Sequence, residues 1–183
     1  MNRCKWAKDE PNITYHDKEW GRPQHDDTRL FEFLILEGAQ AGLSWVTILK
    51  RRDGYRKAFS DFDALKVSKY TQKRVEKLLQ DESIIRNKLK VNSAVKNAKA
   101  FLKIQTEFGS FDKYLWGFVN HKPIKNKFKK LSDIPTSTEI SEKLSKDLKK
   151  RGFSFVGPTI CYALMQATGM VNDHTSNCFL YGK

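Results

Sequence analysis

The sequence has no long hydrophobic run and no apolar leader, and these absences exclude two classes of protein. Its longest apolar stretch, around Phe31 to Leu36, is interrupted by Glu32 and followed by Glu37. No segment is therefore suited to span a bilayer. The chain begins Met-Asn-Arg-Cys-Lys-Trp, which lacks the apolar core of a secretory signal. We expect a cytoplasmic protein that makes no contact with membranes.

Cysteine is also scarce, with three residues at Cys4, Cys161 and Cys178. An odd number of thiols in a reducing compartment argues against a disulfide framework. Cys161 lies in an apolar helical segment, where we expect it to be a core residue. The other two thiols lie near the ends of the chain with histidines close by, a composition that favours a metal site.

The remaining composition is that of a folded globular protein. Of the 183 residues, 39% are hydrophobic and 30% are charged, so the chain can bury a core without the help of cross-links. We expect one domain over residues 1–183 and a monomer. The net charge of +13 comes from 34 basic and 21 acidic residues, an excess that favours a polyanionic partner. The alternative is a lysine-rich surface that is merely well solvated.

The hydrophobic pattern predicts an all-α fold, because no β-rich run, fixed repeat or low-complexity tract interrupts it. Capping residues mark most of the helix starts. The longest predicted helix runs from Lys88 to Phe108, and the stretch from Asn120 to Ser137, with two prolines and five lysines, is predicted to be an exposed connection. The other predicted helices begin after Asp26, Ser44, Ser68 or Thr71, at Phe111, near Pro135–Ser141 and at Pro158.

A helical hairpin is predicted at about residues 144–169. One helix ends at Gly152, and a second begins after Gly157. Free N–H groups at a helix start bind anions, so this turn suits the phosphates of a DNA backbone. A plain packing corner between two helices is the alternative. The residues predicted to contact DNA here are Lys150, Arg151, Gly152, Gly157 and Thr159.

Four residues could together close a tetrahedral metal shell: Cys4, His16, His174 and Cys178. A Cys2His2 shell leaves no open position for water, so such a zinc would be structural. It would join the N-terminal and C-terminal segments. From spacing alone, ordinary buried cysteines and histidines are the favoured interpretation, because Cys4 and His16 lack the spacing of a zinc finger.

Aromatic residues crowd the first quarter of the sequence around one carboxylate. Glu37 follows Phe33 and Leu34 at helical spacing, so it projects from an apolar face and needs hydrogen-bond donors there. A purine amino group is a suitable donor, and indole rings offer surfaces for stacking. The alternative is an aromatic core with Glu37 paired to a lysine or a helix N-terminus. The candidate pocket residues are Trp6, Tyr15, Trp20, Glu37 and Trp45.

Several motifs in sequence order resemble the DNA-3-methyladenine glycosylase type I family, and the resemblance spans Arg3 to Cys178. Its N-terminal part is carried by Arg3-Cys4-x-Trp6, Tyr15-His16-Asp17-x-Glu19-Trp20-Gly21 and Leu36-Glu37-Gly38-Ala39-Gln40-Ala41-Gly42-Leu43-Ser44-Trp45. Its C-terminal part is carried by Trp116-x-Phe118-Val119-Asn120-His121, Ile134-Pro135-Thr136, Leu148 to Gly157, Ile160-Cys161-Tyr162, Met165-Gln166-Ala167 and Val171-Asn172-Asp173-His174.

The resemblance implies a helix-hairpin-helix DNA glycosylase that excises 3-methyladenine from alkylated double-stranded DNA by base flipping. It implies zinc at Cys4, His16, His174 and Cys178, which reverses the interpretation from spacing. Glu37 and Tyr15 would contact the base, Trp45 would stack on it, and Trp6 and Trp20 would line the pocket. Gly42 and Leu43 would fill the gap left by the extruded nucleotide.

The resemblance also bears on the reaction. Many members of the wider superfamily carry an Asp where this chain has Asn172, and no hairpin lysine is placed as a Schiff-base nucleophile, so we expect a monofunctional enzyme. A role for the neighbouring Asp173 stays open. The alternatives are a non-catalytic DNA-binding module with structural zinc, a zinc enzyme with an open coordination position, and a glycosylase with a wider substrate range that includes 7-methylpurines.

Overall fold

The computed structural model describes residues 1–183, and helices dominate it. No helix is long and apolar enough to cross a membrane. Two strands of two residues each, paired in parallel, are the only sheet. The elements are α1 Asn12–Lys18, α2 Asp27–Gln40, α3 Trp45–Leu49, α4 Arg52–Ala58, η1 Ser60–Phe62, α5 Ala64–Ser68, α6 Gln72–Leu78, α7 Lys88–Phe108, α8 Phe111–Gly117, β1 Ile124–Lys125, η2 Leu131–Asp133, α9 Glu139–Lys150, α10 Pro158–Ala167 and β2 Val171–Asn172.

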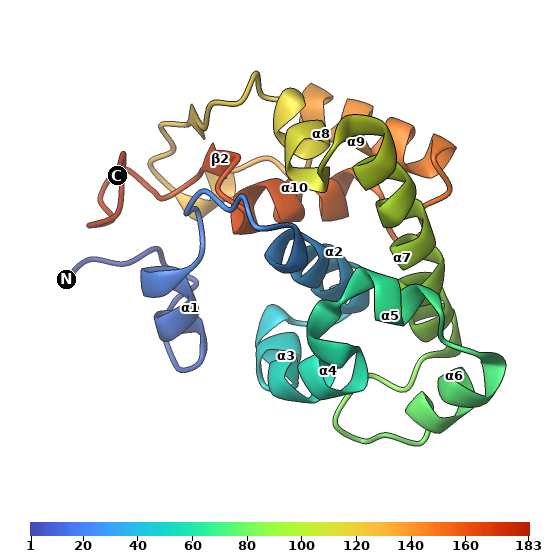
Figure 1. Ribbon diagram of the computed structural model, residues 1–183. Coiled ribbons are helices and arrows are strands. Elements are labelled where there is room, and N and C mark those ends of the chain that lie inside the picture. Colours follow the sequence, from blue (N-terminus) through green and yellow to red (C-terminus); the bar gives the residue numbers. More distant parts are fainter.

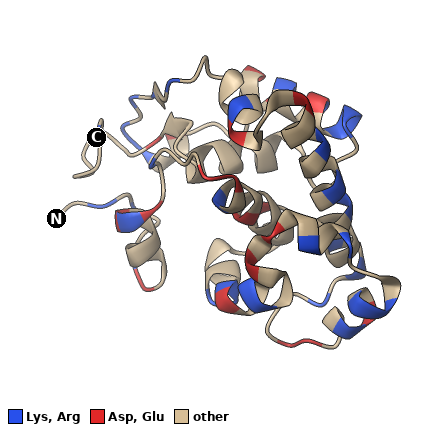
Figure 2. Cartoon of the chain, viewed as in Figure 1, with Lys and Arg blue, Asp and Glu red and all other residues tan.

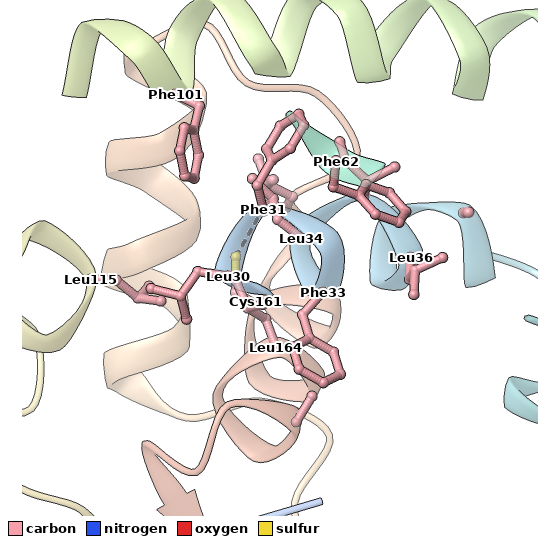
Figure 3. Close-up of a cluster of buried hydrophobic side chains, with 14 of the residues drawn as sticks. Leu30, Phe31, Phe33, Leu34, Leu36, Phe62, Phe101, Leu115, Cys161 and Leu164 are labelled. Carbon is pink, nitrogen blue, oxygen red and sulfur yellow. Dashed lines mark hydrogen bonds between the residues drawn. The ribbon is translucent and has the colours of Figure 1, made fainter. Parts of the chain in front are cut away.

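Helix α2 lies at the centre of the molecule. It contacts α3, α7, α8 and α10, and Figure 1 shows α3–α6 on one side of it and α8–α10 on the other. Every residue from Leu30 to Ala39 is buried. A helix surrounded on all sides is expected to be apolar all round, and residues 30–39 of α2 are so except for two glutamates. Figure 3 shows its side chains packed against Phe62, Phe101, Leu115 and Leu164 from four other elements.

The capping residues predicted from the sequence begin or end the main helices. The side chains of Asp26, Ser44 and Thr71 accept hydrogen bonds from backbone N–H groups at the starts of α2, α3 and α6. Gly109 ends α7 with φ +86°, a conformation that favours glycine. Helix α8 is two residues shorter than predicted, ending at Gly117 rather than Val119.

Three helices were not predicted: α1, α4 and α5. Helix α1 has no side-chain cap at Pro11 and is short, so it depends on tertiary packing rather than on a local signal. It carries Tyr15 and His16, both buried. Both termini lie on the same side of the molecule (Figure 1), where α1 packs close to the C-terminal segment.

Candidate functional site

The two buried glutamates of α2 have opposite surroundings. The Glu32 carboxylate binds the guanidinium groups of Arg29, Arg52 and Arg56. Glu37 is only 4% exposed and has no hydrogen-bond or ion-pair partner in the protein. A buried carboxylate without donors is costly, so such a group points to a ligand that supplies them. Neither alternative partner for Glu37, a lysine or a helix N-terminus, is present.

Glu37 faces a cavity of about 370 Å³, a volume within the range of ligand pockets. All five residues predicted for the pocket line it: Trp6, Tyr15, Trp20, Glu37 and Trp45. The non-catalytic alternative predicts no such pocket. The structure therefore brings together residues that arise from the N-terminal segment, α1, α2 and α3.

Two further polar groups at this cavity lack protein partners. The hydroxyl of Tyr15 makes no hydrogen bond although its side chain is buried, and the indole N–H of Trp45 is buried without an acceptor. The Tyr15 and Trp45 rings lie with centroids 5.3 Å apart, and those of Trp6 and Trp20 lie 5.1 Å apart. An aromatic enclosure with a buried carboxylate and a buried, unpartnered phenol hydroxyl suits a flat, hydrogen-bonding ligand.

Burial controls the protonation of both polar residues. It raises the pKa of Glu37 to about 8, because a charge without partners is poorly solvated inside the protein. Burial, and then the nearby Glu37 carboxylate, raise the pKa of the Tyr15 phenol well above its ordinary value. Tyr15 is consequently a neutral hydroxyl, able to donate or accept a hydrogen bond.

Other residues of the cavity were not predicted as site residues. Tyr162 and Gln166 lie one turn apart on α10 and line the wall, and both donate hydrogen bonds to the fully buried carboxylate of Asp173, at 2.6 and 2.8 Å. Asn126 donates a third bond to Asp173, which therefore holds pocket residues rather than facing the ligand. The buried Asn172 also lies outside the cavity lining. The i, i+4 spacing of Tyr162 and Gln166 was the available signal.

The four predicted metal ligands converge in space. The donor atoms of Cys4, His16, His174 and Cys178 lie within 4.8 Å of one another, and all four residues are buried. Three sulfur-to-nitrogen distances are 3.4, 3.5 and 3.6 Å. Tetrahedral zinc with ordinary bond lengths places sulfur and nitrogen ligands about 3.6 Å apart. The donor set and its spacing thus fit a four-coordinate ion. Residues 174–178 contain a turn and a bend but no helix, so His174 and Cys178 do not lie one helical turn apart.

The surroundings of the cluster also suit metal ligands. The second ring nitrogen of His16 lies 2.8 Å from the Asp17 carboxylate, and that of His174 lies 3.1 Å from the Trp20 carbonyl oxygen. Such partners fix the tautomer of a ligating histidine. Arg3 in turn binds Asp17 through two guanidinium nitrogens. Burial lowers the pKa of His174 to about 4, so its ring is neutral, as ligation requires.

The predicted hairpin is present as α9, a turn and α10, over residues 139–167 rather than about 144–169, and α9 begins at Glu139 after its cap Thr138, within the predicted start at Pro135–Ser141. Gly152 follows the end of α9 and has φ +93°. A Cβ added at Gly152 or at Gly157 would meet no other atom within 4 Å. Thr159 is exposed at the start of α10 and lines the cavity, so the hairpin and the cavity adjoin. Gly38 allows this closeness, because a Cβ there would lie 3.3 Å from Phe155 in the hairpin turn.

The two basic residues of the hairpin differ. Lys150 is exposed and unpaired, whereas the Arg151 guanidinium binds both Glu107 and Asp147. Arg151 is therefore part of the packing between α7 and α9 rather than a free charge. Gly42, with φ +77°, and Leu43, which is 39% exposed, form the turn between α2 and α3.

Comparisons with known proteins agree with this geometry. The family model for methyladenine glycosylase matches residues 6–181. DNA-3-methyladenine glycosylase 1 of Escherichia coli is 50% identical over 182 residues, covering 99% of this chain and 97% of the relative. DNA-3-methyladenine glycosylase of Haemophilus influenzae is 49% identical over 177 residues, or 96% of each chain. A solved variant of 3-methyladenine DNA glycosylase I in complex with 3-methyladenine is 38% identical with a TM-score of 0.96, and the match covers 100% of this chain and 99% of that one.

Proposed function

The chain belongs to the methyladenine glycosylase family, and we propose that it removes 3-methyladenine from alkylated double-stranded DNA by hydrolysing the bond between base and sugar. The observation that carries the proposal is the Glu37 carboxylate, buried without a protein partner on the wall of an aromatic cavity. A base inside a duplex cannot reach such a cavity, so the nucleotide must be flipped out, at a cost of about a few kcal/mol.

In this proposal the cavity reads the flipped base through its unpartnered groups. Glu37 accepts hydrogen bonds from the base, the Tyr15 hydroxyl adds a second polar contact, and the indole of Trp45 stacks on the ring. Trp6 and Trp20 form the wall behind it. A positively charged base favours the ionised form of Glu37, so its arrival offsets the cost of burying that charge.

The chemistry required of the protein is modest because methylation at N3 leaves the adenine base positively charged. When the bond between base and sugar breaks, its electron pair moves to the base, which departs as neutral 3-methyladenine. Water adds to the sugar carbon and loses a proton. No lysine lines the cavity, so no amine is placed to form a Schiff base with the sugar. We therefore propose a monofunctional enzyme in which Glu37 is the only carboxylate at the site.

Zinc is the proposed ion for the cluster of Cys4, His16, His174 and Cys178, because two thiolates and two imidazoles form a complete tetrahedral shell. Such an ion would supply a cross-link between the two ends of the chain, with no open position for a substrate. The proposed role is structural, and the alternative of a zinc enzyme lacks a vacant ligand position.

The DNA backbone is proposed to lie against the hairpin. Lys150, the backbone of Gly152 and Gly157, and the free N–H groups around Thr159 would contact phosphates. On the other side of the lesion, Leu43 would enter the space vacated by the flipped nucleotide, with Gly42 allowing the sharp turn. We further propose that residues 1–183 act as one monomeric domain. Because the similar DNA glycosylases are bacterial and bacterial DNA lies in the cytoplasm, the cytoplasm is the proposed compartment.

Base release is the direct experiment. Duplex DNA treated with a methylating agent is incubated with the protein, and the released bases are separated by chromatography. The proposal expects 3-methyladenine in the soluble fraction, and the amounts of 7-methylpurines measure how wide the substrate range is. Protein that binds this DNA but releases no 3-methyladenine would overturn the proposal in favour of the non-catalytic module.

A further inference from the structure

The loop between α8 and α9 carries a run of lysines that the proposed site does not use. We call the segment Lys122–Lys130 the lysine strap. It contains no acidic residue, and all five of its lysines are exposed. Figure 2 shows blue along this loop. None of the five is in a salt bridge, and only the ammonium group of Lys125 has a hydrogen-bond partner, the carbonyl oxygen of Gly182. The lysines are Lys122, Lys125, Lys127, Lys129 and Lys130.

The backbone of the strap is fixed to the C-terminal segment. Ile124 and Asn126 donate N–H hydrogen bonds to Met170 and Asn172, at 2.9 and 3.1 Å. Further along, the carbonyl oxygen of Phe128 accepts a bond of 2.8 Å from the Ser176 N–H. These bonds attach the strap next to the metal cluster, so its position is set by the fold.

The strap presents Lys125, Lys127 and Lys129 on one face, and the exposed Lys130 follows them at the end nearest the cavity. Ile124, Asn126 and Phe128 are half-buried, whereas the residues that alternate with them are exposed lysines. In an extended chain the side chains of alternate residues point the same way, roughly 6.6 Å apart. The strap is therefore a row of ammonium groups on a fixed backbone, and although the Asp133 carboxylate accepts a hydrogen bond from the Lys130 backbone N–H, none of these ammonium groups is in an ion pair.

The row leads directly to the mouth of the cavity. Leu131 follows Lys130, is 45% exposed, and lines the cavity together with Ile134. Thr159, at the start of the hairpin helix α10, lines the same cavity. A DNA strand whose nucleotide enters the cavity would therefore lie between the hairpin and the strap.

We propose that Lys127, Lys129 and Lys130 form a second phosphate-binding surface, which holds the DNA backbone beside the cavity independently of the hairpin. The partner follows from charge complementarity and from the position of the strap at the proposed point of nucleotide entry, so the inference rests on the proposed function. Flexible ammonium groups bind phosphate as point charges without reading the base sequence. The surface adds affinity for any duplex, damaged or not.

The test compares two triple variants with the same change in charge. The first is Lys127→Gln/Lys129→Gln/Lys130→Gln. The control is Lys69→Gln/Lys73→Gln/Lys77→Gln, which removes exposed, unpaired lysines on and beside α6, far from the strap in Figure 1. The affinity of each protein for an undamaged duplex is measured over a range of sodium chloride concentrations.

The logarithm of the affinity falls linearly with the logarithm of the salt concentration. Each lost phosphate contact reduces the steepness of that fall, called the slope here, by about 0.9. The strap variant is expected to lower the slope by about two to three and to bind at least tenfold more weakly at low salt. The control is expected to change the slope by less than about one. Equal slopes for the two variants would overturn the proposal. So would unchanged DNA binding accompanied by lost binding to phosphatidylglycerol vesicles, which would assign the strap to a membrane surface.

Base release separates this inference from the function on which it rests. At saturating protein, the strap variant should release 3-methyladenine from methylated DNA in a single turnover at the wild-type rate, because Glu37 and Tyr15 are untouched. A slower rate at saturation would mean that the substitutions disturb the cavity wall and would count against a separate surface. The strap variant could show the expected reduction in salt dependence while the wild-type protein releases no 3-methyladenine. That result would support the strap as a phosphate-binding surface and overturn the glycosylase assignment.

Discussion

The imidazole of His174 lies edge-on to the indole of Trp20, with the ring centroids 4.7 Å apart. Trp20 lines the cavity, and His174 belongs to the proposed metal cluster. On the same wall, the ring centroids of Trp6 and His16 lie 5.3 Å apart. The cluster and the cavity therefore share a wall, and an ion that fixes the two histidines also fixes the two tryptophans.

Metal content follows from this arrangement. We expect one zinc per chain by elemental analysis. The Cys178→Ser variant should lose the ion, whereas Cys161→Ser should keep it, because Cys161 is buried outside the cluster. Removal of the metal by a chelator should lower the melting temperature and change tryptophan fluorescence. Full metal content in Cys178→Ser would show that the cluster is not the binding site.

Removal of the Tyr15 hydroxyl should slow the excision of 3-methyladenine by a modest factor. Tyr15→Phe keeps the packing against Trp45 and removes only the hydroxyl, so DNA binding and folding should be preserved. A neutral hydrogen bond contributes about 1 kcal/mol, so 3-methyladenine excision should fall about three- to tenfold. Tyr70→Phe is the control, because its hydroxyl bonds Ala58 away from the cavity. Equal excision rates for the two variants would remove Tyr15 from base recognition.

The two basic hairpin residues should respond differently to substitution. Lys150→Gln removes an exposed, unpaired charge, so DNA affinity should fall severalfold with little change in stability. Arg151→Gln breaks pairs with Glu107 and Asp147 and should mainly lower the melting temperature. Thermal denaturation and DNA titration of both variants check this. The opposite pattern would show that Arg151 contacts DNA despite its carboxylate partners.

Glu37 should also make stability depend on pH. Its folded pKa is about 8 against an ordinary value of 4.5, so between these values the folded protein holds a proton that the unfolded chain has lost. The contribution of protonated Glu37 to the free energy of unfolding is complete below pH 4.5 and is lost as pH rises towards 8.

The Glu37→Gln variant lacks this titration. As pH rises from 4.5 to 8, its free energy of unfolding should therefore increase relative to that of the wild type by up to about 1.4 kcal/mol per pH unit. Denaturant unfolding of both proteins at pH 5 and pH 8 measures the difference, since other groups titrate equally in both. Parallel stability curves would show that Glu37 is not held protonated by burial.

The sequence predicted the parts of the fold that have local signals. Caps such as Asp26 and Ser44 and the periodicity of residues 88–108 depend on neighbours along the chain. Helix α1 was missed because tertiary contacts stabilise it. Arg151 was predicted to contact DNA, because the sequence pattern does not show that Asp147 and Glu107, the latter 44 residues away, together bind its guanidinium group.

Patterns also could not separate the two glutamates of α2. Glu32 and Glu37 both lie among apolar residues, and only the folded chain shows that Arg52 and its neighbours reach one of them. The pocket aromatics were identified because they cluster near the N-terminus, whereas Tyr162 and Gln166 enter the wall from α10, far away in sequence.

The most direct measurement compares wild type and Glu37→Gln in a single turnover on methylated duplex DNA, with DNA affinity measured in parallel. The substituted amide would keep the shape of the side chain but could not carry the charge that balances a cationic base. A charge-assisted hydrogen bond contributes about 1.5–3 kcal/mol, so release of 3-methyladenine should slow by about ten- to a hundredfold while DNA affinity stays within about twofold. Release at the wild-type rate would contradict the assignment of Glu37 as the group that receives the damaged base.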